Sequence, residues 1–185
     1  MLPSRNVQIR VTFSGVVQGV GFRPFVVRLA KKLSVKGYVR NMGDAGVEAL
    51  LQGTPAHVRQ FIEALRTEAP PVCEITDIDS SDATYSEEFD EFTIHESSED
   101  RRISGSVLPP DIGICDLCMG DMLNSDSRWY EYPFTCCASC GPRFAAVTRL
   151  PYDRERTNMD IFPLCSECVG EYQDHENRRF HAQGI

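Results

Sequence analysis

The stretch "SGVVQGVGFRPFVV" (residues 14–27) places three glycines and a glutamine in front of an arginine, a proline and an apolar run. Before it, residues 7–13 alternate apolar and polar side chains, which predicts a strand with one buried face. After it, apolar residues recur every three to four positions up to Leu33, and Pro24 suits the first turn of a helix because its missing N–H is not needed there. The glycine-rich loop is therefore expected between a strand and a helix N-terminus.

The residues that follow this helix continue the same alternation of strands and helices. They predict strands at 36–42 and 46–53, a second helix that begins after Thr54, and extended segments around 74–85 and 92–95. The order of the elements is β-α-β-β-α-β, in which two extended segments can take one strand position. This order predicts a ferredoxin-like α+β fold, in which an antiparallel sheet carries both helices on one face.

A polar segment at residues 98–110 contains glycine and proline and has no apolar periodicity. Such a composition is typical of a linker between domains. We therefore expect a first domain at residues 5–97 and a second, cysteine-rich region at residues 111–185.

The 185-residue chain carries a net charge of -8 and is 42% hydrophobic, which is ordinary for a folded globular protein. No run of 18 apolar residues and no secretory signal pattern is present, so the sequence predicts a cytoplasmic protein without a membrane segment. Residues 1–66 hold ten basic and three acidic side chains, and can accommodate an anion. Residues 101–185 hold nine arginines and twelve acids, which argues against a nucleic-acid surface.

Two interpretations of the glycine-rich loop follow from its residues. Successive backbone amides at a helix N-terminus form a cradle for an anion, glycine lets the backbone approach the ligand, and Arg23 can add two donors to a phosphate or carboxylate. Alternatively, the glycines serve only the geometry of a tight strand-to-helix turn. The glycine pattern alone leaves both interpretations open.

The longer segment "GVVQGVGFRPFVVRLAKKLSVKGYVRNMGDAGVEALLQG" (residues 15–53) resembles the acylphosphatase family. The resemblance implies a ferredoxin-like fold and hydrolysis of acyl phosphates without a metal. It also implies that Arg23 binds and neutralises the phosphoryl group and that Asn41 orients the attacking water. The phosphoryl oxygens would be held by the loop residues Val16, Val17, Gln18, Gly19, Val20 and Gly21.

The second half of the chain contains pairs of cysteines with the spacing of metal ligands. Cys115 and Cys118 are followed after 18 residues by Cys137 and Cys140, a pattern that predicts four thiolates around one tetrahedral Zn²⁺. A shell closed by four cysteines leaves no position for water, so this zinc is expected to be structural. Cys136 and Cys140 offer an alternative CxxxC ligand pair, although the regular CxxC spacing favours Cys137 as the ligand.

The cysteine pattern repeats after 50 residues. When Cys115 is aligned with Cys165, the second cysteine of each CxxC pair and the glycine two residues after it also align. Arg128 then aligns with Arg178. The partners of the third knuckle would then fall at positions 187 and 190, so Cys165 and Cys168 are expected to form half of a second site.

This half site has two interpretations. In the first, the second metal binds weakly or only through another chain, and residues 141–185 are poorly ordered. In the second, His175 and His181 complete a Cys2His2 shell, but the repeat aligns them with Ser125 and Glu131, which favours the first interpretation.

The segments "PDIGICDLC", "YEYPFTCCASCGPRF", "FPLCSEC" and "RRFHAQ" resemble the zinc-finger region of the carbamoyltransferase family that matures [NiFe] hydrogenases, the HypF family. In that family an acylphosphatase-like domain precedes two zinc fingers; Cys136 departs from it, because the family usually has asparagine there. The resemblance implies an amino-terminal part that uses carbamoyl phosphate as carbamoyl donor, with ATP-dependent domains downstream and a partner protein whose cysteine accepts the carbamoyl group. The implied zinc ligands are Cys115, Cys118, Cys137, Cys140, Cys165 and Cys168.

A non-catalytic alternative remains for the whole chain. The acylphosphatase-like domain and the fingers could act only as a docking module for partner proteins. The presence of Arg23, Asn41 and the complete loop favours the enzyme.

Overall fold

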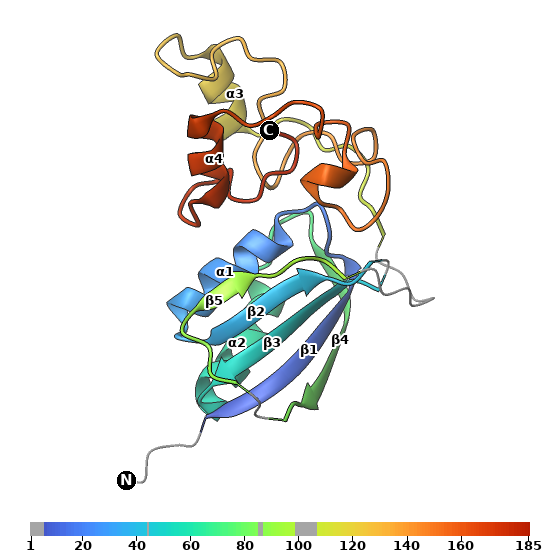
Figure 1. Cartoon of the computed structure of the whole chain (residues 1–185), viewed down its shortest axis with the longest axis vertical. Coiled ribbons are helices and arrows are strands. Elements are labelled where there is room, and N and C mark those ends of the chain that lie inside the picture. Colours follow the sequence, from blue (N-terminus) through green and yellow to red (C-terminus); the bar gives the residue numbers. More distant parts are fainter. Residues whose placement is uncertain (1–5, 44, 85–86, 99–106) are drawn as a thin grey trace.

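The computed structural model describes residues 6–43, 45–84, 87–98 and 107–185. These residues form a sheet region and, above it in Figure 1, a smaller cysteine-rich region that we call the finger region (residues 107–185). The predicted linker at residues 98–110 falls mostly on 99–106, which lie outside the described residues. None of the described helices is long and apolar enough to cross a lipid bilayer.

The sheet has five strands in the order β4-β1-β3-β2-β5. Their bounds are β1 Val7–Val16, β2 Lys36–Asn41, β3 Val47–Gly53, β4 Glu74–Asp82 and β5 Phe92–Ile94. The first four pair antiparallel, but β5 pairs parallel with β2. The prediction of an entirely antiparallel sheet is therefore wrong at this edge, because β5 runs opposite to β4 and so in the same direction as β2.

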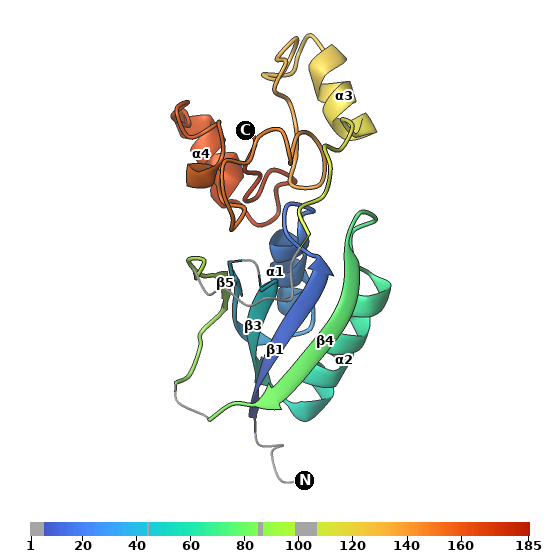
Figure 2. The ribbon, with the colours of Figure 1, turned by 90° about the vertical axis from the view of Figure 1, so that its right-hand side faces the viewer.

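Two helices, α1 (Phe22–Lys32) and α2 (Pro55–Thr67), pack on one face of this sheet (Figure 2). The alternation predicted for the first strand sets Val11 and Phe13 fully inside the core beneath them. At the start of α2, the Thr54 hydroxyl accepts a hydrogen bond from a backbone amide in the first turn, which satisfies one of the unpaired donors of the helix. The ferredoxin-like arrangement is confirmed, and it sets the glycine-rich loop at the end of the sheet that faces the finger region.

The finger region contains two short helices, α3 (Asp116–Leu123) and α4 (Ser166–Gln173), and a 3-10 turn, η1 (Arg154–Arg156). Each α-helix begins directly after the first cysteine of a CxxC pair, so α3 and α4 match the 50-residue repeat. The poor order predicted for residues 141–185 stays a prediction, although Ala182 and Ile185 are buried in one cluster with cysteines of the first repeat.

Candidate acyl-phosphate site and cysteine cluster

The glycine-rich loop joins β1 to the N-terminus of α1. Gly19 and Gly21 have φ angles of 70° and 75°, in the left-handed region that favours glycine, and Gly21 is the N-cap of the helix. A Cβ atom at Gly21 would lie 2.7 Å from the Ser139 hydroxyl oxygen of the finger region. Glycine is needed here both for the turn and for the close approach of the second region.

The loop presents a run of backbone amides without acceptors. The amides of residues 18–21 have no hydrogen-bond acceptor among the described residues. Val16 is the last residue of β1, and the Val17 amide donates to the Gly15 carbonyl, so these two are less available than the resemblance implies. Four unpaired amides at a helix N-terminus, where the helix dipole is positive, form an anion cradle.

Arg23 lies in the first turn of α1, directly beside this cradle, and is only 8% exposed. Its guanidinium makes an ion pair of 2.8 Å with Asp153 and donates a 2.9 Å hydrogen bond to the Tyr152 carbonyl. Both partners belong to the finger region, and both are oxygens. Arg23 therefore already has two oxygen acceptors of the kind that a phosphoryl group would supply.

Asn41, the last residue of β2, is 1% exposed and faces the same point. Its amide nitrogen donates to the Tyr152 carbonyl at 3.4 Å, while its oxygen Oδ1 is buried and has no hydrogen-bond partner among the described residues. An unpaired buried acceptor is costly unless a ligand or water uses it. Asn41 is therefore suited to hold a water molecule beside an anion in the cradle.

The side chain of Gln18 holds the loop in place. Its amide nitrogen donates to the Gly43 and Gly46 carbonyls at 2.9 and 3.1 Å, which ties the loop to the turn between β2 and β3. Its oxygen accepts from the Tyr152 amide at 3.2 Å. This residue thus links three segments that are far apart in the sequence.

Two cavities adjoin Arg23. The one over the loop has a volume of about 20 Å³ and is closed by Arg143, Tyr152 and Gln183 of the finger region. The other, about 430 Å³, is lined by Arg23 and also by Asp153 and His95. The cradle itself is therefore almost filled, whereas space is available next to it.

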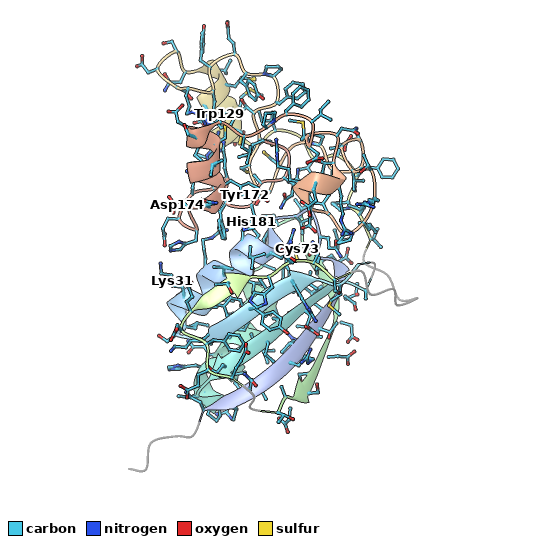
Figure 3. The ribbon with its side chains drawn as sticks, in the orientation of Figure 1. Lys31, Cys73, Trp129, Tyr172, Asp174 and His181 are labelled. Atoms are coloured by element: carbon cyan, nitrogen blue, oxygen red, sulfur yellow. The ribbon has the colours of Figure 1, made fainter. Side chains whose placement is uncertain are left out.

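His181 belongs to the wall of both cavities, beside Tyr172 at the boundary between the two regions (Figure 3). Burial lowers the pKa of His181 to about 4, and the positive charge of Arg23 acts in the same direction. This imidazole is therefore neutral at physiological pH.

The cysteine cluster consists of Cys115, Cys118, Cys137 and Cys140, whose sulfur atoms all lie within 4.8 Å of one another. The Cys137 sulfur is 3.6 Å from that of Cys140 and 4.0 Å from that of Cys115. Ligands of a tetrahedral Zn²⁺ with Zn–S bonds of about 2.3 Å are separated by about 3.8 Å. The four thiols therefore fit one tetrahedral ion.

Cys136 does not take part in this cluster. It is 1% exposed, and its side chain packs beneath Gly141 and Gly184. Burial raises the pKa of its thiol to about 11, which keeps it protonated and unreactive.

Cys165 and Cys168, in the second repeat, remain a pair among the described residues. His175 faces Lys31 and Glu176, and the ring of His181 packs at a tilt beside Tyr172. Neither histidine forms a group of possible metal ligands with these thiols among the described residues. The alternative Cys2His2 shell is therefore not formed.

Arginines connect the two repeats in a reciprocal way that the sequence did not predict. Arg128 of the first repeat donates to the sulfurs of Cys165 and Cys168 at 3.4 and 3.2 Å. Arg178, its counterpart 50 residues later, donates to the Cys118 sulfur at 2.8 Å. Each repeat therefore supplies a cation to the cysteines of the other repeat.

Sequence reasoning also missed Tyr152 and Asp153, which meet Arg23 across 129 and 130 positions of the chain. Their segment, "PYDRER", has no spacing that points to α1. Charge complementarity with Arg23 was the only available signal, and many acids of this chain share it.

Comparison with known families follows the two regions of the structure. The pattern of the acylphosphatase family matches residues 9–94, and that of the HypF finger matches residues 114–147 and 164–185. The acylphosphatase of Thermotoga petrophila is 40% identical over 86 residues, which are 46% of this chain and 93% of that protein.

Longer relatives match both regions. The probable carbamoyltransferase HypF of Methanocaldococcus jannaschii is 47% identical over 150 residues, 81% of this chain and 20% of its own length. The carbamoyltransferase HypF of Rhodobacter capsulatus is 38% identical over 176 residues, 95% of this chain and 23% of its own length. A crystal structure of full-length HypF in its phosphate- and nucleotide-bound form superimposes with a TM-score of 0.89 at 35% identity, over 98% of this chain and 24% of that one. The chain thus spans about a fifth to a quarter of these relatives' length.

Proposed function

This chain belongs to the acylphosphatase family through its sheet region and is homologous in both regions to the amino-terminal part of HypF carbamoyltransferases, and we propose that its sheet region hydrolyses an acyl phosphate. The observation that carries the proposal is the convergence of three features on one point. These are the unpaired amides of residues 18–21, the guanidinium of Arg23 and the buried, unpartnered oxygen of Asn41.

The proposed mechanism relies on positioning and charge. The loop amides and Arg23 hold the phosphoryl oxygens and offset their negative charge, which is most valuable where charge develops in the transition state. Asn41 Oδ1 accepts a hydrogen bond from a water molecule and directs its oxygen at phosphorus. The bond between phosphorus and the acyl oxygen breaks, the carboxylate leaves, and the water proton passes to solvent. Because an acyl phosphate has a good leaving group, no strong general base is required.

We infer that carbamoyl phosphate is the physiological acyl phosphate and that the product, carbamate, is passed to activities elsewhere in a longer carbamoyltransferase. A partner protein with an acceptor cysteine would then receive the carbamoyl group. Support comes from the homology of both regions, in the same order, to HypF carbamoyltransferases. We place this reaction in the cytoplasm, since CxxC pairs with the spacing of metal ligands are typical of a reducing compartment.

We infer further that Cys115, Cys118, Cys137 and Cys140 hold a structural Zn²⁺. Four thiolates close the coordination shell, so the ion would organise the finger region and take no part in the hydrolysis. Cys165 and Cys168 would contribute to a second finger.

The test is hydrolysis of benzoyl phosphate and carbamoyl phosphate by the zinc-loaded chain without ATP, in parallel with phosphate binding by calorimetry. Arg23→Ala should lower turnover at least about 100-fold, since it removes one preorganised charge donor. Arg59→Ala, an exposed arginine on α2, is the matched control and should leave turnover unchanged.

Asn41→Ala separates the two proposed roles. It should lower turnover far more than it weakens phosphate binding, because Asn41 is assigned to the water and not to the anion. If none of these proteins binds phosphate or turns over either substrate, the hydrolase proposal is wrong and the docking module becomes the better description.

A further inference from the structure

The segment Tyr152–Asp153 of the finger region occupies the point on which the acyl-phosphate site converges. The Tyr152 carbonyl accepts hydrogen bonds from Arg23 at 2.9 Å and from Asn41 at 3.4 Å. The Asp153 carboxylate pairs with Arg23 at 2.8 Å, and the Tyr152 amide donates to Gln18 at 3.2 Å. All three side chains of the sheet region that surround the site are thus bonded to two consecutive residues of the finger region.

The oxygens of this segment resemble those of the proposed substrate in their chemistry. A carboxylate and a carbonyl offer Arg23 one negative charge and two acceptors, which is what a phosphoryl group offers an arginine. We propose that Tyr152–Asp153 is an internal occupant of the acyl-phosphate site, which competes with the phosphoryl anion for Arg23 and must withdraw before substrate binds. This inference rests on the proposed hydrolase function and assigns a regulation to the same site.

The space in the site supports this competition. The cavity over the loop measures about 20 Å³. One water molecule needs about 10–15 Å³ on this measure, so the cavity holds a single water but no phosphorus with four oxygens. A phosphoryl group in the cavity over the loop and the present position of the segment are therefore mutually exclusive.

The ion pair between Arg23 and Asp153 is incompletely hydrogen-bonded, which makes withdrawal of the segment feasible. Asp153 is 8% exposed, yet its second oxygen, Oδ2, has no hydrogen-bond partner among the described residues. A buried carboxylate with one unpaired oxygen is stabilised less than a fully bonded one. The 430 Å³ cavity that Arg23 and Asp153 both line offers the carboxylate room to move.

Arg143 links the glycine-rich loop to the cysteine cluster, and Tyr152 is bonded to the residue next to Arg143. The Arg143 side chain donates to the Gly19 carbonyl of the loop and, at 2.7 Å, to the Cys140 carbonyl of the cluster. The Tyr152 hydroxyl donates to the Pro142 carbonyl at 3.4 Å. The internal occupant is therefore held against the site by the same backbone that carries two of the clustered thiols.

Asp153→Asn in the zinc-loaded chain is the direct test, because it removes the charge and keeps the shape. If the open site is about a tenth populated in the parent, removing the competition should tighten the binding of inorganic phosphate, measured by calorimetry, about tenfold. The KM for benzoyl phosphate should fall in parallel. Asp160→Asn, an exposed aspartate of the same region, is the control and should change neither quantity.

A second measurement on the parent protein covers the case in which Asp153→Asn disturbs folding. Saturating phosphate should speed hydrogen exchange at the Tyr152 amide, because its bond to Gln18 is broken when the segment withdraws. Phosphate that binds while this amide keeps its full protection would overturn the inference.

The results also separate this inference from the proposed function. Phosphate binding that is lost in Arg23→Ala but unchanged or weaker in Asp153→Asn keeps the hydrolase site and rejects the internal occupant. Absence of phosphate binding in the parent and in Asp153→Asn rejects both.

Discussion

The sheet region and the finger region are stabilised in different ways. The core of the sheet region is made of valine, leucine and phenylalanine side chains that two helices and a sheet enclose. The small buried cluster of the finger region is mainly cysteine, and its surface exposes large apolar side chains such as Leu117, Phe144 and Ile161. We therefore expect apolar burial, to which Phe180 of the finger region also contributes, to stabilise the first region, and a bound metal and ion pairs to stabilise the second.

Removal of the metal should produce the largest difference in stability between the two regions. In small zinc-dependent folds the ion contributes on the order of 10–16 kcal/mol, so chelation should unfold the finger region and leave the sheet intact. Fluorescence of Trp129, the single tryptophan, reports the first event, and hydrogen exchange in β1 and β3 reports the second.

A pair of cysteine variants sharpens this prediction. Cys140→Ala should have the effect of chelation, and Cys73→Ala, outside the cluster, should not. Simultaneous loss of amide protection in both regions would show that the sheet also depends on the metal.

Phe13→Ala should destabilise the sheet region and leave the metal site of the finger region unchanged. Phe13 is fully buried and packs edge-on against Phe22 at 5.3 Å between ring centroids, so its truncation should lower the free energy of unfolding of the sheet region by about 3–5 kcal/mol. Denaturant titration followed by circular dichroism measures this loss, and metal content should stay at the parent level. Phe144→Ala, at a side chain that is 71% exposed, is the control; an equal loss there would argue against the assigned core.

Arg178→Gln tests the coupling between the two repeats. Its hydrogen bond of 2.8 Å to the Cys118 sulfur offsets thiolate charge around the metal, so its loss should weaken metal affinity about 10–100-fold. Competition with a chromophoric chelator measures this affinity. Arg149→Gln, an exposed arginine, should leave affinity unchanged; equal affinities for all three proteins would mean that the contact is only structural.

His181 should produce the smallest effect, a pH dependence confined to the finger region. Its pKa is about 4 in the folded protein and about 6.5 when unfolded, so the unfolded state binds more protons below pH 6.5. Stability should therefore fall as the pH drops from 6.5 toward 4, by about 1 kcal/mol at pH 5.5.

The comparison is denaturant unfolding at pH 7.5 and 5.5, followed by Trp129 fluorescence. His181→Asn should reduce the difference between the two pH values, since asparagine does not titrate and tolerates the φ of 50° at this position. An unchanged pH dependence would assign it to other groups.

Local patterns in the sequence predicted most of the elements and the main ligand groups. Alternation predicted β1, three-to-four spacing predicted α1, and Thr54 predicted the start of α2. The CxxC spacing predicted the thiols that the structure brings together. The 50-residue repeat aligned the two CxxC pairs, but the sequence did not predict the helices α3 and α4 that begin at them. These patterns succeed because they arise from the periodicity of one helix or strand, or from one tight turn.

Only the tertiary structure decided what faces the anion cradle and how the repeats meet. Nothing in the sequence indicates that Asp153 pairs with Arg23, that Arg128 and Arg178 exchange partners between the repeats, or that β5 pairs parallel with β2. Such contacts join residues that are tens to more than a hundred positions apart, and they depend on how whole elements pack. Sequence periodicity therefore determined the elements and their local chemistry, whereas packing between the two regions determined which groups meet in the site.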